Sequence, residues 1–330
     1  MRNVGLGIIG LGHMGQVHLR HSMKLNGAHL VGVADVSKRA LASARNLGAG
    51  KLFPSYEQLL SDPDVDAVVI SLPTHLHLQC AKKAAETGKH VFLEKPMARN
   101  IAEAEEILST VRRCRVKLMI GYPLRFDSTF RSLKKEIDSG TLGDIEVAAA
   151  VNIGSGPLYH RAQEYAPSPV PEWWFNKELT GGGALVDLGS HMINLLRWYF
   201  GDVTSIGAKL GHRFNMDIED SATCIATFKS GTLATISVGW FSEEYRLRVD
   251  LFGTVSHASV QNPKSNALLT AAQMLATGTT RFQQPYRVEL QHFVDSLLKD
   301  RDPSPSGEDG LKDLEAISKA YKNDIWLGNE

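Results

Sequence analysis

The sequence contains little cysteine, no excess of charge of either sign and no long apolar run. Its 330 residues include Cys80, Cys114 and Cys224, and 36 basic side chains stand against 36 acidic ones. Few, widely spaced cysteines predict reduced thiols that pack in a core. The balanced charge argues against a nucleic acid partner, and no apolar run reaches the roughly 18 residues that cross a bilayer. The first residues enter a strand without a secretion signal, so we expect a cytoplasmic protein with no membrane partner.

The remaining composition and the hydrophobic pattern are typical of an α/β protein with two domains. Within residues 1–121, nearly unbroken apolar strands alternate with helices, which predicts a parallel sheet covered on both faces. Within residues 122–330, longer alternating segments joined by tight turns predict a large, open and mostly antiparallel sheet. These segments lie at 145–153, 203–210, 221–228, 233–240 and 246–252.

A glycine fingerprint follows the first apolar run. Gly10, Gly12 and Gly15 form the pattern G-x-G-x-x-G before a helix predicted over 16–25. Gly10 allows a tight turn, Gly12 lets a pyrophosphate approach the backbone, and Gly15 lets the helix pack closely on the strand. The N–H groups at the helix N-terminus favour phosphate, and we expect His13 near it.

An acidic residue ends the second apolar run. Asp35 lies about 20 residues after the last glycine, where a carboxylate accepts hydrogen bonds from the adenosine ribose. A glycine-rich turn in some other α/β protein would leave this acid unexplained. The carboxylate repels a 2′-phosphate and therefore favours NAD over NADP. Lys38 and Arg39 could still receive that phosphate, so NADP stays open.

Glu94-Lys95-Pro96 follows the apolar strand at 90–93. Ligands of parallel sheets bind beyond the carboxyl ends of the strands, so we expect Lys95 in the crevice. Pro96 restricts Lys95 to extended conformations and thereby fixes where its amine points. A solvated ion pair between Glu94 and Lys95 is the alternative interpretation, and these three residues do not decide between the two.

Asp187 and His191 follow a glycine cluster at 181–183 and are four residues apart. In a helix they would share one face. A carboxylate beside an imidazole raises its pKa and orients it as a general base. The alternative is an ordinary helix pair, which contributes roughly 0.2–0.5 kcal/mol to stability.

Other polar and aromatic residues are candidates for the substrate site. Tyr122 and Arg125 follow the last strand of the first domain, and Arg125 is either a fork for a carboxylate or phosphate or one half of an interdomain ion pair. Aromatic rings often stack on sugar or nicotinamide rings, although interior packing is as good an explanation. The further candidates are Asn152, His160, Arg161, Trp173 and Trp174.

Three histidines and one long segment are considered separately. His75, His77 and His90 have no cysteine or acid cluster at ligand spacing, so we expect no metal site. The segment 263–284 either covers the pocket or contacts a neighbouring subunit, and the sequence does not decide between these.

Taken together, the motifs resemble the Gfo/Idh/MocA family, which includes glucose–fructose oxidoreductase and inositol dehydrogenase. The resemblance covers nearly the whole chain. It rests on the fingerprint and on four further elements, which are Ser71-Leu72-Pro73-Thr74-His75-Leu76-His77, Glu94-Lys95-Pro96, Arg125-Phe126, and Gly182-Gly183 leading to Asp187 and His191. It implies a Rossmann domain and an α+β domain whose open sheet forms homodimer or homotetramer contacts.

The resemblance also implies a role for several residues. Lys95 would hydrogen-bond the reacting oxygen and contact the cofactor, His191 would accept the hydroxyl proton, and Asp187 would bind a neighbouring hydroxyl. Asn194 stands where the family commonly has aspartate, which we expect to alter the contacts to a polyol. Further cofactor contacts are implied for Met14, Ser71, Pro73, Thr74, His77 and Glu94.

The sequence therefore predicts an NAD-dependent dehydrogenase that oxidises a secondary hydroxyl of a cyclic polyol, a sugar or a nucleotide sugar. Two alternatives remain. One is a non-catalytic, NAD-sensing regulator on the same fold, which would be expected to lose Lys95 or His191. The other is a sugar–sugar oxidoreductase with tightly bound NADP.

Overall fold

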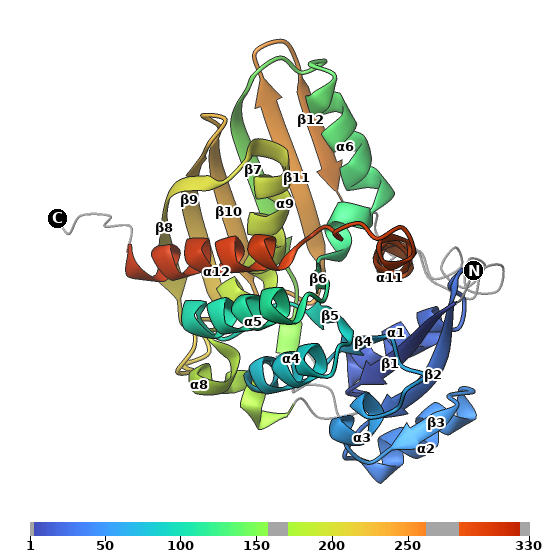
Figure 1. Ribbon diagram of the computed structural model, residues 1–330. Coiled ribbons are helices and arrows are strands. Elements are labelled where there is room, and N and C mark those ends of the chain that lie inside the picture. The colour runs from blue at the N-terminus through green and yellow to red at the C-terminus, as the bar shows by residue number, and fades with distance from the viewer. Residues whose placement is uncertain (1–2, 158–170, 262–283, 324–330) are drawn as a thin grey trace. The chain divides into compact units, whose positions relative to one another are not determined.

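The structure, a computed structural model, describes residues 3–157, 171–261 and 284–323 (Figure 1). These residues form two compact units. The first contains the chain up to Phe126 together with 284–311, and the second contains Asp127 to 261 together with 312–323. From the sequence we had expected a boundary at residue 121 and had left open whether the C-terminal helix packs back on the first domain. In the structure, the helix Gln284–Leu298 belongs to the first unit, and the division falls within the helix Gly307–Lys322.

Strands and helices alternate in the first unit. The strands are β1 (Val4–Ile9), β2 (Ala28–Ala34), β3 (Lys51–Phe53), β4 (Ala67–Ile70), β5 (His90–Glu94) and β6 (Leu118–Gly121). The helices are α1 (His13–Ser22), α2 (Lys38–Asn46), α3 (Tyr56–Leu60), α4 (His77–Glu86), α5 (Ile101–Cys114) and α11 (Gln284–Leu298), with short 3-10 turns η1 (Thr74–Leu76) and η2 (Pro123–Phe126).

The strands of this unit form one parallel sheet in the order β3-β2-β1-β4-β5-β6. This is the doubly wound order of dinucleotide-binding folds, so the predicted Rossmann architecture is confirmed. Because β1, β4 and β5 are neighbours and parallel, the loops after Ile9, Ile70 and Glu94 leave the sheet at the same edge. Ligands of such sheets bind at this edge, where the order of the strands reverses.

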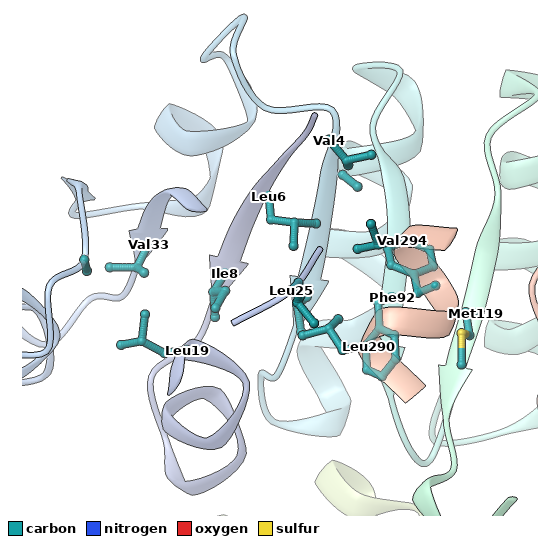
Figure 2. Close-up of a cluster of buried hydrophobic side chains, with 14 of the residues drawn as sticks. Val4, Leu6, Ile8, Leu19, Leu25, Val33, Phe92, Met119, Leu290 and Val294 are labelled. Atoms are coloured by element: carbon teal, nitrogen blue, oxygen red, sulfur yellow. The ribbon is translucent and has the colours of Figure 1, made fainter. Parts of the chain in front are cut away.

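One face of this sheet packs on α1 and α11 (Figure 2). Side chains alternate along a strand, so Val4, Leu6 and Ile8 point to the same face, and all three belong to this buried cluster. Leu19 of α1 and Leu290 of α11 pack against them. This cluster places α11 in the core of the first unit. Helices α4 and α5 pack beside each other in the same unit.

The second unit consists of a six-stranded sheet with helices. Its strands are β7 (Ile145–Ile153), β8 (Val203–Gly211), β9 (Ser221–Phe228), β10 (Leu233–Gly239), β11 (Arg246–Gly253) and β12 (His257–Gln261). Its other elements are α6 (Ser128–Asp138), η3 (Glu172–Phe175), α8 (Lys177–Thr180), η4 (Leu185–Gly189), α9 (Ser190–Phe200) and the part of α12 (Gly307–Lys322) from residue 312 onward.

The strand order of this sheet is β12-β11-β7-β10-β9-β8. All neighbouring strands are antiparallel except β7 and β10, so the predicted mostly antiparallel sheet is confirmed. The hairpin between β9 and β10 turns at Ser230-Gly231, as expected, whereas β12 was not anticipated. Among the described residues, none of the helices is both long and apolar enough to cross a membrane.

Candidate functional site

The glycine fingerprint forms the loop between β1 and α1, and each glycine has its own reason to be there. Gly10 has a φ of +86°, and a Cβ on Gly15 would lie 1.8 Å from the carbonyl oxygen of Gly10. A Cβ on Gly12 would meet nothing within 4 Å. The fold therefore requires Gly10 and Gly15, while Gly12 leaves open space in front of the backbone, which fits a pyrophosphate.

The N-terminus of α1 also fits a phosphate. Gly12 caps the helix without a side-chain hydrogen bond, and the first turn, which contains His13 and Met14, has no acidic residue. The peptide N–H groups and the positive end of the helix dipole at this terminus favour an anion such as phosphate.

Asp35 connects this loop to β2. Its Oδ2 accepts a hydrogen bond from the backbone N–H of Leu11 at 2.7 Å, and its Oδ1 accepts one from Ser37 at 2.7 Å. The sequence had suggested only a ribose contact for this side chain. A carboxylate has about four acceptor positions, so Asp35 can shape the loop and still accept from a ribose hydroxyl. The donors and the open space together fit NAD.

His77 joins the loop after β4 to the loop after β5. It is buried, its Nδ1 lies 3.0 Å from the carbonyl oxygen of Pro96, and its Nε2 lies 2.9 Å from that of Leu72. Burial lowers its pKa, and the two carbonyls oppose this shift. Both polar positions of the ring are thus engaged by backbone. In the same loop, Ser71 and Pro73 are partly exposed, whereas Thr74 is buried.

Glu94 and Lys95 stand at the carboxyl end of β5. The carboxylate of Glu94 is buried and its Oε1 lies 2.6 Å from Nε2 of the fully buried His18. The bond between Lys95 and Pro96 is cis, and Lys95 is partly exposed. The partner of Glu94 is therefore a buried imidazole. From the sequence we had considered a solvated ion pair between Glu94 and Lys95 instead.

A second buried acid, Glu289 of α11, lies near Glu94. Burial is the main cause that raises the pKa of its carboxyl well above the usual range, and the charge of Glu94 adds to the rise. Neither oxygen has a well-formed hydrogen bond to a described residue, although the backbone of Tyr122 approaches and partly offsets the rise. Burial therefore favours the protonated form of Glu289.

Tyr122 and Arg125 follow β6 and are both buried. The Nη2 of Arg125 lies 3.3 Å from Oδ1 of Asp309. Since both residues belong to the first unit, this ion pair lies within one domain and is not the interdomain pair considered from the sequence.

In the second unit, Glu219 holds the glycine cluster. Its Oε1 accepts hydrogen bonds from the N–H groups of Gly183 at 3.0 Å and Leu185 at 2.9 Å, and from the Tyr321 hydroxyl at 2.6 Å. Burial and the adjacent Glu219 raise the pKa of Tyr321 well above the usual range, so its hydroxyl keeps the proton that it donates.

The segment that carries Asp187 is not an α-helix. Leu185–Gly189 forms a π-helical turn, and α9, which contains His191, begins directly after it at Ser190. The helix expected through Asp187 and His191 is therefore present, but it begins with a π-helical turn and continues as an α-helix. Single π-turns frequently occur at functional sites. The indole Nε1 of the buried Trp240 donates to Oδ2 of Asp187 at 3.1 Å.

The remaining candidates of the second unit lie around this segment or apart from it. Asn152 is buried and donates to the carbonyl of Leu188 at 3.2 Å. Asn194, also buried, donates to Oδ2 of Asp313 at 2.6 Å. These contacts give both amides a structural role.

Three candidates remain. Trp174 is partly exposed, and its ring lies 5.4 Å from that of Trp173. His160, Arg161 and all but the last residue of 263–284 lie outside the described residues.

Comparison with known proteins identifies the family. Residues 4–122 match the family model described as "Oxidoreductase family, NAD-binding Rossmann fold", and residues 130–258 match the "GFO/IDH/MocA C-terminal domain". The chain belongs to the GFO/IDH/MocA family. It is an NAD-binding oxidoreductase.

Similar proteins match over nearly their whole length. A myo-inositol 2-dehydrogenase of Thermotoga maritima is 26% identical, with 92% of this chain and 91% of that protein covered. An inositol 2-dehydrogenase/D-chiro-inositol 3-dehydrogenase of Lacticaseibacillus casei is 29% identical, with 97% and 91% covered. The crystal structure of a probable dehydrogenase from Thermotoga maritima has a TM-score of 0.83 at 26% identity, covering 97% of this chain and 96% of that one.

Proposed function

We propose that this GFO/IDH/MocA protein oxidises a secondary hydroxyl of a cyclic polyol or a sugar, including a nucleotide sugar, by hydride transfer to NAD. The observation that carries the proposal is Lys95 at the carboxyl end of β5, beside the loops of the fingerprint and of β4. Asp187 and His191, in the glycine-led segment of the second unit, supply the other polar groups. The inositol dehydrogenases among its relatives favour an inositol as substrate.

In this proposal the two units share the proton chemistry. NAD, when bound, supplies the hydride acceptor. Lys95 donates a hydrogen bond to the reacting oxygen and stabilises the negative charge that develops on it. His191 accepts the hydroxyl proton as general base, and Asp187 binds a neighbouring hydroxyl. The assignment requires that Lys95 and His191 reach the same substrate hydroxyl.

The residues that would hold NAD are proposed from the geometry of the first unit. Gly12, His13 and Met14 present the backbone to the pyrophosphate, and Asp35 accepts from the ribose. The loops after β4 and β5 supply the remaining contacts, from Ser71, Pro73, Thr74, His77, Glu94 and Lys95. For the substrate we propose Tyr122, Arg125 and Trp174, with Asn152 and Asn194 acting through the packing described above.

A screen of inositols, aldoses and UDP-sugars, with NADH absorbance as the readout, tests the reaction. Lys95→Ala and His191→Ala should each lower kcat by about 100-fold or more, as expected for loss of a general acid–base group, while NADH binding measured by fluorescence persists. The exposed Lys299 and His29 offer matched controls, Lys299→Ala and His29→Ala, with unchanged kcat. Full activity of the Lys95 and His191 variants would refute the roles. NADP that copurifies and resists dialysis would indicate the sugar–sugar oxidoreductase instead.

We also propose that two copies of the chain associate through the open face of the six-stranded sheet of the second unit. Leu233 and Phe252 both pair in register with Val147, so the three apolar side chains share one face, and each is more than 40% exposed. Such an apolar patch is typical of an interface. Light scattering should give the mass of a dimer or tetramer for the wild type and for Met23→Lys, an exposed position in the first unit, but a smaller mass for Val147→Asp. A monomeric wild type would refute the association.

A further inference from the structure

Lys95 lies between two residues that are each held by a buried histidine. On its N-terminal side, the carboxylate of Glu94 pairs with Nε2 of His18 at 2.6 Å. On its C-terminal side, the carbonyl of Pro96 lies 3.0 Å from Nδ1 of His77. The chain is therefore tethered immediately before and immediately after the lysine.

The first tether connects Lys95 with the helix that begins at the fingerprint. His18 belongs to α1, has no exposed surface, and packs edge-on against Phe92 of β5 with a ring separation of 5.2 Å. A hydrocarbon side chain could fill the same space. It would leave the carboxylate of Glu94 buried without this partner, which is costly, so packing alone does not account for an imidazole here.

The second tether connects Lys95 with the loop after β4. The other ring nitrogen of His77 lies 2.9 Å from the carbonyl oxygen of Leu72, within Ser71-Leu72-Pro73. One imidazole thus lies between two loops that leave adjacent parallel strands. A ring with one proton donates to one carbonyl, and a ring with two protons donates to both.

We propose that His18 and His77 are positioning residues for Lys95. His18 acts through Glu94 and fixes the lysine relative to the fingerprint helix, and His77 acts through Pro96 and fixes it relative to the β4 loop. This inference rests on the role proposed for Lys95. Neither imidazole needs to touch a substrate. Their effect is to limit how far the lysine backbone can move, and a displacement of about 1 Å at a reacting group can cost roughly 100-fold in rate.

Hydrogen exchange of the protein without added cofactor tests the tethers directly. His18→Leu should speed amide exchange in peptides that cover residues 93–98. His77→Leu should do so in peptides covering both 71–76 and 93–98. In both variants, peptides from β7 to β11 of the second unit should exchange as in the wild type. The proposal would be overturned if the variants exchanged at residues 93–98 as slowly as the wild type. It would also be overturned if exchange became faster evenly over the chain, because neither result indicates a local tether.

Steady-state kinetics with a polyol found in the substrate screen tests the consequence. The leucine variants should lower kcat by about tenfold or more while KM changes by less than about threefold. His18→Gln keeps an N–H donor for Glu94 and should recover most of kcat. Failure of this rescue, or an unchanged kcat in His18→Leu, would overturn the positioning role. If the wild type oxidises none of the polyols or sugars, the proposed function fails, and the exchange experiment still decides whether the tethers exist.

Discussion

Glu219 in the second unit and Glu289 in the first are both buried carboxyl groups, and their surroundings differ. One oxygen of Glu219 accepts from two backbone N–H groups and from a tyrosine hydroxyl. Glu289 has no well-formed hydrogen bond to a described residue, and the charge of Glu94 is close enough to raise its pKa further. The same side chain thus accepts from three donors in one unit, whereas in the other its surroundings favour the protonated form.

The difference shows how each unit fixes its candidate site. In the second unit, the Glu219 side chain, distant in the sequence, holds the glycine-led segment before Asp187. In the first unit, the loops leave a regular parallel sheet, and histidines hold the residues around Lys95. Glu289 is buried nearby but does not hold any described segment by a well-formed hydrogen bond. A substitution of glutamate should therefore have opposite effects on stability at the two positions.

The largest effect is expected for Glu219→Ala. This change leaves the N–H groups of Gly183 and Leu185 and the Tyr321 hydroxyl buried without their acceptor, at about 1–3 kcal/mol for each unsatisfied group. We expect urea unfolding to report a loss of about 3 kcal/mol or more. Because Leu185 begins the turn that contains Asp187, kcat should fall as well, while NADH affinity stays near that of the wild type.

Tyr321→Phe provides a graded control at the same cluster. It removes one of the three donors and leaves the carboxylate with its two backbone partners, so the expected loss of stability is about 1 kcal/mol. If Glu219→Ala were as stable as the wild type, Glu219 would not hold the glycine segment, and the contrast between the two acids would disappear.

The two units also differ in how much the sequence alone could predict. The strand order of the first unit and the roles of Gly10 and Gly15 follow from local patterns, because parallel strands and tight turns restrict the residues that they accept. The sequence also predicted Lys95 at the carboxyl end of a strand. It did not predict that Asp35 would hold the backbone of Leu11, because that hydrogen bond joins segments 24 residues apart.

In the second unit, the sequence did not predict the local geometry of the candidate site. A separation of four residues between Asp187 and His191 suggested an α-helix, whereas Asp187 lies in a π-helical turn whose residues bond to Glu219 and Trp240. Contacts from such distant positions leave no periodic signal in the sequence.

A usable signal did exist for Glu289 in the first unit. It stands four residues before Phe293, on the apolar face of a helix, where a charged residue is unusual and indicates a special environment.

An effect of opposite sign to that of Glu219→Ala, and a smaller one, is expected for Glu289→Gln. In the folded protein the pKa of Glu289 is raised, whereas in the unfolded chain the carboxyl ionises near 4.5. Unfolding of the wild type therefore releases a proton above that pH, and the free energy of unfolding falls as the pH rises towards the folded pKa. The fall due to this group is at most about 1.4 kcal/mol per pH unit.

Glutamine has the shape of the neutral acid and does not ionise, so Glu289→Gln should match the wild type near pH 4 and become increasingly more stable than it between pH 5 and pH 8, by roughly 1 kcal/mol or more. All other side chains are the same in the two proteins, so the difference between the two stability curves isolates position 289. Urea unfolding at several pH values measures that difference. If the difference in the free energy of unfolding stayed constant across the pH range, Glu289 would be ionised in the folded protein. The first unit would then stabilise a buried carboxylate with hydrogen-bond donors, and the contrast with Glu219 would be lost.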